Sequence, residues 1–204
     1  MTDDIQSVRD DLAFMRALVH DKDPLPATFG GHLLAPGLLF GVFTLPVWGI
    51  LTNRLPLDAA WLHWLWLPAA ILYLPVFIWL LRQGRADTWG PSKRLFISVW
   101  SAVGTMGGVT LACLIIATFK IGGYFMLLWP PLAFMLWGGG WMAVSIARRE
   151  TWCKWLAWGC FATAALAAWL IRLPEQWLVM ALGMIVWIAG PGLLIILRAR
   201  RRDA

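Results

Sequence analysis

The sequence predicts an all-α integral membrane protein, a bundle of six transmembrane helices preceded by a short cytoplasmic amphipathic helix. Of the 204 residues, 60% are hydrophobic and only 14% are charged. Apolar runs of about 20 residues, enough to cross a bilayer at about 1.5 Å per residue, recur along the chain. We expect a leader with a proline-containing linker at 1–31, a membrane domain at 32–198 and a basic tail at 199–204. The expected spans are 33–52, 59–82, 95–119, 123–147, 152–171 and 176–197.

Residues 3–21, DDIQSVRDDLAFMRALVHD, have the pattern of a soluble amphipathic helix. Asp3 with Gln6 provides an N-terminal capping signal, and Pro24 and Pro26 end the helix before the membrane. Apolar residues at spacings of three, four, three and four form a candidate interaction face. These residues are Ile5, Val8, Leu12, Met15 and Val19.

A stripe of this size should be covered, because exposing each such side chain forgoes about 1.5 to 3 kcal/mol. Residues 3–19 contain four aspartates and two arginines, a balance that disfavours an anionic lipid surface. Three surfaces therefore remain as alternatives for packing against this apolar face. They are the protein's own basic cytoplasmic face, the same helix of a second copy, and a different cytoplasmic protein.

Positive charge is divided unequally between the two sides of the predicted membrane domain. With both termini inside, all but three of the 17 lysines and arginines fall on the cytoplasmic side, as the positive-inside rule expects. The three outside are Arg54, Lys120 and Arg172. Anchoring to lipid headgroups explains the net charge of +6 without a nucleic acid partner. We expect a multi-pass protein of the bacterial inner-membrane type.

The third predicted span carries small and polar residues on one helical face. They are Ser98, Ser101, Thr105, Gly108 and Ala112, at spacings of three, four, three and four. In lipid, helices associate through close backbone approach and interhelical hydrogen bonds, which such residues allow. We expect this face to pack the third helix near the bundle centre, with a polar conduit as the alternative. Gly37 and Gly41 in the first span share the small-x3-small spacing.

Proline and glycine interrupt three of the predicted spans. The first and sixth share a short echo, APGLL at 35–39 and GPGLL at 190–194, at similar depth in the cytoplasmic half. The fourth contains the pair at 130–131, WPPL, and a glycine run at 138–140. Proline removes a backbone donor, so we expect weak points in these helices. Broken helices also occur at transporter binding sites, which is the second interpretation.

Groups that carry chemistry are not expected inside the membrane. All 11 acidic residues fall in the leader, the loops or the tail. His32 and His63 lie at opposite ends of their spans, too far apart to ligate one haem. The three cysteines form no C-x-x-C pair and are expected to be buried thiols: Cys113, Cys153 and Cys160. We therefore expect no metal, cofactor or catalytic residue.

A bundle without catalytic groups, next to a patterned leader, predicts a non-catalytic regulatory, sensory or scaffold component of the membrane. It would act through residues 3–21 by self-association or by docking a cytoplasmic partner. The runner-up is a carrier or channel for a small neutral or apolar solute, suggested by the fourth span and by the face of Ser98, Ser101 and Thr105. A membrane enzyme acting on a lipid-like substrate is third.

The charge distribution predicts the location of the C terminus. A green fluorescent reporter fused after Ala204 should fluoresce, because it folds in the cytoplasm, whereas alkaline phosphatase fused at the same position should be inactive. Active phosphatase without fluorescence would reverse the topology.

Overall fold

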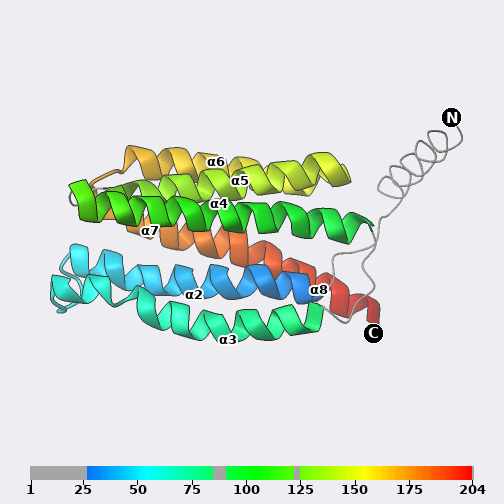
Figure 1. Cartoon of the computed structure of the whole chain (residues 1–204), viewed down its shortest axis with the longest axis horizontal. Coiled ribbons are helices and arrows are strands. Elements are labelled where there is room, and N and C mark those ends of the chain that lie inside the picture. The colour runs from blue at the N-terminus through cyan, green and yellow to red at the C-terminus, as the bar shows by residue number, and fades with distance from the viewer. Residues whose placement is uncertain (1–26, 85–90, 122–124, 204) are drawn as a thin grey trace, which may run out of the picture.

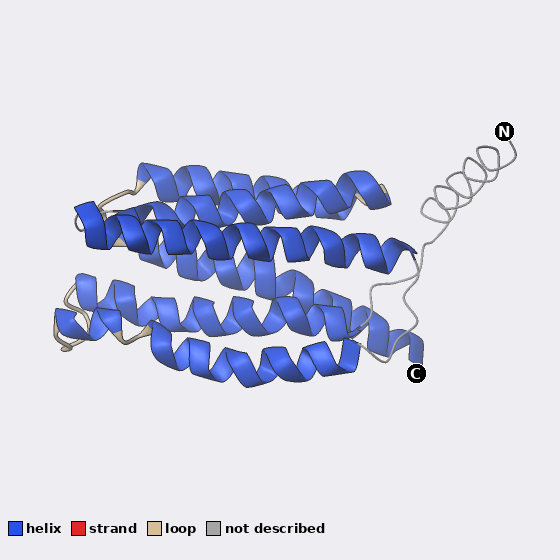
Figure 2. Ribbon diagram, viewed as in Figure 1, coloured by secondary structure: helices blue, strands red, loops and turns tan. Residues whose placement is uncertain are grey.

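Helices form all the regular structure of the residues that the computed structural model describes, which are 27–84, 91–121 and 125–203. Figure 2 shows only helices and short connections in these ranges. The elements are α2 (Ala27–Leu51), the 3-10 helix η1 (Ala59–His63), α3 (Trp66–Gly84), α4 (Pro91–Ile121), the 3-10 helix η2 (Phe125–Leu128), α5 (Trp129–Arg148), α6 (Thr151–Trp169), α7 (Glu175–Gly183), the π-helix η3 (Met184–Ala189) and α8 (Gly190–Asp203). The prediction of an all-helical protein is confirmed.

Four helical stretches are long and apolar enough to cross a membrane. They are Ala27–Leu51, Arg94–Ile121, Phe125–Arg148 and Glu175–Arg201, and they match the first, third, fourth and sixth predicted spans. Helices α3 and α6 match the second and fifth. Helix α6 has 19 residues and includes Lys154 and four tryptophans, which lower its hydropathy. A membrane crossing by α3 and by α6 stays a prediction.

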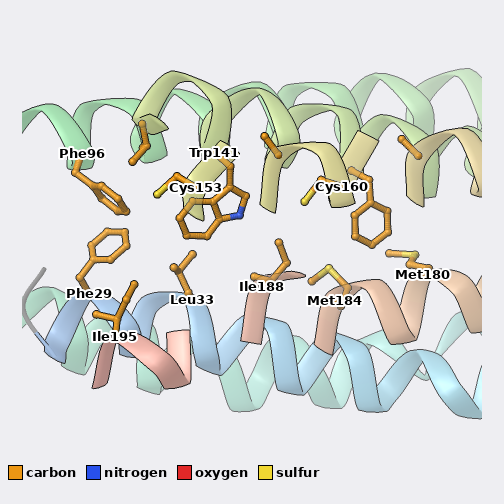
Figure 3. Close-up of a cluster of buried hydrophobic side chains, with 14 residues drawn as sticks. Phe29, Leu33, Phe96, Trp141, Cys153, Cys160, Met180, Met184, Ile188 and Ile195 are labelled. Atoms are coloured by element: carbon orange, nitrogen blue, oxygen red, sulfur yellow. The ribbon is translucent and has the colours of Figure 1, made fainter. Parts of the chain in front are cut away.

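The helices run along the long axis of the molecule in two layers (Figure 1). Figure 3 shows buried side chains between a layer that contains α4, α5 and α6 and a layer that contains α2 and α7–η3–α8. The largest fully buried side chains there include Trp141, Phe96, Phe134 and Ile188. Helix α3 packs on α2, where the rings of Phe40 and Tyr73 lie 5.8 Å apart. A dense aromatic and aliphatic core therefore joins the layers.

The first and last helical segments touch backbone to backbone. A Cβ atom added at Gly37 would fall on the backbone nitrogen of Ala189 and lie 2.8 Å from its Cα. A Cβ added at Gly192 would lie 2.6 Å from both the carbonyl oxygen of Gly30 and the backbone nitrogen of Leu34. The two copies of the PGLL echo thus lie side by side, and glycine there permits a contact that any side chain would prevent.

The last span is irregular just before its proline. The Gly190 N–H donates to the carbonyl of Ile185, five residues earlier, so Met184–Ala189 has the wider π-helical turn. Pro191 follows at once and cannot donate to the preceding turn. The weak point predicted for the sixth span is therefore found as a π-helix next to the echo. Helix α2 stays continuous through Pro36 and Pro46.

The fourth span is not broken in its middle. Pro130 and Pro131 lie in the first turn of α5, where the missing N–H groups have no intrahelical partner to lose, and the short helix η2 precedes them. The glycine run stays within the continuous helix Trp129–Arg148, and a Cβ at Gly138 would lie 2.5 Å from the ring of Phe161 on α6. The prolines begin this helix, and its glycines let α6 come close.

The contact at Gly37 predicts a large difference between two Gly→Ala substitutions. Gly37→Ala should lower the free energy of unfolding by about 1–3 kcal/mol, because the new methyl group meets rigid backbone. Gly139→Ala should leave it unchanged or raise it by up to about 1 kcal/mol, since no atom of another part of the structure lies within 4 Å of that position. Reversible unfolding in mixed micelles, followed by circular dichroism, measures both. Equal effects would contradict the close contact.

Candidate functional site

The first candidate surface, the face of the predicted leader helix, lies outside the described residues. It comprises Ile5, Val8, Leu12, Met15 and Val19. The second candidate surface, on α4, lies within them.

Helix α4 is attached to the molecule along one side. Phe96 is buried, and its ring meets that of Phe29 on α2 with centroids 3.9 Å apart. Trp100 packs edge to face on Trp141 of α5 with centroids 4.9 Å apart. Val103 fits against Gly140 of α5, where a Cβ atom would lie 2.9 Å from its methyl group. Aromatic contacts and a glycine notch therefore hold this side of α4.

The predicted face of α4 points outward. All five of its residues are exposed: Ser98, Ser101, Thr105, Gly108 and Ala112. The residues Ile97, Ser98, Ser101, Ala102, Thr105 and Met106 line a shallow open depression, and all of them belong to α4 itself. The expected position near the bundle centre is therefore wrong, because α4 lies at the edge. Packing of this face against another chain stays a prediction.

Burial separates α4 from the other candidate spans. Only 11% of its most apolar stretch is buried, against 44% for each of the spans Ala27–Leu51 and Phe125–Arg148 and 50% for Glu175–Arg201. The hydroxyl groups make hydrogen bonds within their own helix: Ser98 donates to the carbonyl of Arg94 and Thr105 to that of Ser101, both at 2.9 Å. No atom of another segment lies within 4 Å of a Cβ placed at Gly108. Among the described residues, no other segment covers this face, which is thus open for a neighbouring helix, and a role as the lining of a conduit stays a prediction.

A polar cluster lies at the end of the bundle where α2 begins and α8 ends, which we call the basic end. Glu150 joins α5 to α6, and its Oε1 accepts hydrogen bonds from Arg148, whose Nη2 lies 3.0 Å away. The Trp152 indole N–H donates to the other carboxylate oxygen, and the Arg198 guanidinium lies over the Trp152 ring, 5.6 Å from its centroid. The Arg148 side chain is only 6% exposed. The cluster ties α5, α6 and α8 together.

Gln176, at the opposite end, is a fully buried amide that was not predicted from the sequence. Its Nε2 donates to the carbonyl of Leu127 at 2.7 Å and to that of Ala167 at 3.1 Å, which links α7 to η2 and α6. Its Oε1 has no hydrogen-bond partner among the described residues. A glutamine next to Glu175 at a predicted helix start reads as a surface residue, so the sequence held no signal for this burial.

The remaining candidate ligands do not converge. His32 lies near the start of α2 and His63 in η1, beyond the far end of that helix. Cys153 and Cys160 are buried as predicted, whereas Cys113 is exposed, contrary to the prediction for that thiol. In the described part of the chain, no three His, Cys, Asp or Glu side chains gather where they could hold a metal ion.

Comparison with known protein families, curated proteins and solved structures gives no significant match.

The polar cluster predicts that Glu150 supports the basic end. Glu150→Ala should lower the free energy of unfolding by about 1–3 kcal/mol, because it leaves the buried Arg148 guanidinium without this carboxylate. Lys154 is exposed in the first turn of α6, so Lys154→Ala should leave the free energy of unfolding within about 0.5 kcal/mol of that of the unmodified protein. Unfolding in mixed micelles measures the pair, and an unchanged Glu150→Ala protein would show that the cluster is not stabilising.

Proposed function

We propose that the protein is a non-catalytic, multi-pass membrane protein of the bacterial inner-membrane type that works as a regulatory or scaffold component by associating with other protein chains. Four apolar helices long enough to span a membrane support the membrane part of this proposal. In the full topology that we propose, α3 and α6 also cross, giving six spans. The basic end then faces the cytoplasm, in accord with the positive-inside rule.

The exposed face of α4 is the observation that carries the proposal. A lipid-facing helix surface gains nothing from glycine and hydroxyl side chains, whereas a helix contact in lipid depends on them for close approach. The face joins two serines, a threonine and Gly108 over about three turns of a span of which only 11% is buried. We therefore propose that another transmembrane helix covers it.

A second copy of the chain is the occupant that we propose. Two α4 helices related by a two-fold axis would each offer the same small residues, so one face supplies both halves of the contact. More of α4 would then be buried, closer to the 44% to 50% of the other three candidate spans. Heterologous partners are an outcome that the experiment below separates.

The interior supports a role without catalysis. Trp141, Phe96, Phe134 and Ile188 fill the centre between the layers. Two polar side chains of the interior link helices: the Gln176 Nε2 donates to two backbone carbonyls, and the Trp187 indole N–H donates to Thr163 at 2.9 Å. The leader, residues 3–21, stays a second predicted contact element of the same component.

Disulfide cross-linking in native membranes tests the proposed contact. In a chain with Cys113→Ser, the variant Ser101→Cys should form a disulfide-linked dimer on oxidation, because the two-fold contact brings the faces together. Leu74→Cys on α3, an exposed position with no serine, threonine or glycine one turn away, is the matched control and should stay monomeric.

Adding Gly108→Leu to the Ser101→Cys chain should reduce the dimer several-fold, since leucine blocks close approach. A monomeric Ser101→Cys chain, or equal dimer from Leu74→Cys, would contradict self-association through α4. An adduct of Ser101→Cys with a different protein alone would replace the second copy by that partner.

A further inference from the structure

The basic end carries an unbalanced positive surface. Seven exposed basic side chains lie there, at the ends of five helices: Arg82, Arg94, Arg149, Lys154, Arg198, Arg200 and Arg201. The acidic residues of the described ranges at this end are Glu150, which already pairs with Arg148, and Asp203, which ends α8. Figure 1 shows that α2 begins and α3 and α8 end on this side of the molecule. The surface therefore has positive charge available for a negatively charged partner.

The chain enters the bundle in the middle of this surface. Phe29 in the first turn of α2 meets Phe96, two residues after Arg94, with ring centroids 3.9 Å apart. A Cβ atom at Gly30 would lie 2.7 Å from Ile196, two residues before Arg198. The segment before Ala27 thus leaves the structure between the start of α4 and the last turns of α8.

The segment that precedes α2 is acidic and closely tethered. Six aspartates and three basic residues lie between positions 3 and 23. Only residues 22–26 separate the predicted leader helix from α2, and five residues span at most about 17 Å. Such a short tether keeps the leader at an effective concentration of roughly millimolar at the basic end.

The charges of the predicted leader helix are placed for such a contact. At 100° per residue, Asp4 and Asp11 flank one edge of the apolar face, and Arg9 and Arg16 flank the other. A helix laid down on its apolar face would bring both aspartates to the border of the contact. The arginines of α8 lie near the start of α2, because Ile196, two residues before Arg198, packs against Gly30.

We propose that residues 3–21 dock on the basic end of their own chain, with aspartates of the leader against Arg198, Arg200 and Arg201 of α8. The short tether favours the leader's own bundle over that of a second copy, and the aspartates disfavour an anionic lipid surface. A cytoplasmic partner would then reach the apolar face only by displacing this contact. The inference rests on the proposed topology but not on the α4 contact.

A disulfide between two uncharged positions tests this docking in the full-length protein. With Cys113→Ser as background, Ser7→Cys in the leader and Ala199→Cys on α8 leave every charge in place. In vesicles of phosphatidylcholine, oxidation should produce an intrachain disulfide, seen as a shift in mobility at monomer size. Ser7→Cys with Ala60→Cys, an exposed alanine at the opposite end, should not cross-link.

Charge reversal separates docking from chance encounters. Arg200→Glu with Arg201→Glu should slow formation of the disulfide several-fold, and adding Asp4→Lys with Asp11→Lys should restore it. Failure of the reversal to slow the reaction would overturn the charge-based contact. A disulfide found only in dimers would overturn docking on the same chain, and loss of the disulfide when phosphatidylglycerol is added would assign the basic end to lipid.

The Ser101→Cys experiment tests the α4 contact independently of the docking of the leader. A chain that stays monomeric there can still form the intrachain disulfide, so one proposal can fail without the other.

Discussion

Backbone contact between α2 and the segment α7–η3–α8 is the interaction on which the arrangement depends. A bilayer provides no hydrophobic drive for helices to associate, so packing must come from close approach. Gly37 lies against Ala189, and Gly192 lies against Gly30 and Leu34, so the first and last helices form one unit. The π-helical turn before Pro191 gives the last helix its local path along α2. The layer of α4, α5 and α6 then closes over this unit through the aromatic core.

The same arrangement leaves α4 at the edge. Its inner side is occupied by Phe96, Trp100 and Val103, and its small residues point away from the core. Within a soluble protein an exposed serine or glycine needs no explanation. Within a membrane such residues are typical of contacts between helices, and this is the basis of the proposed α4 contact. The chain therefore combines a tightly packed interior with one loosely held helix, which suits a component that assembles with others.

Much of the fold follows from the sequence because hydropathy and helix length are local properties. The helix Thr151–Trp169 differs from the predicted span 152–171 by no more than two residues at either end. The echo at 35–39 and 190–194 indicated equal depth, and the structure adds that each copy lies against residues next to the other, Gly37 against Ala189 and Gly192 against Leu34. The sequence did not predict which residues pack against each small-residue face. Gly37 lies against Ala189 in the interior, whereas Gly108 lies on the exposed side of α4. Periodicity identifies a face, whereas tertiary packing decides what covers it, which is also why Gln176 was missed.

Spin labelling of Cys113 in lipid bilayers tests the central claim most directly. Cys113 is the exposed thiol, whereas Cys153 and Cys160 are buried, so one label per chain sits on α4 without any substitution. Every dipolar coupling between labels then reports a distance between chains. Self-association through α4 predicts a narrow distribution of short distances that persists on dilution with lipid and disappears in Gly108→Leu. A broad background that fades on dilution would contradict the claim.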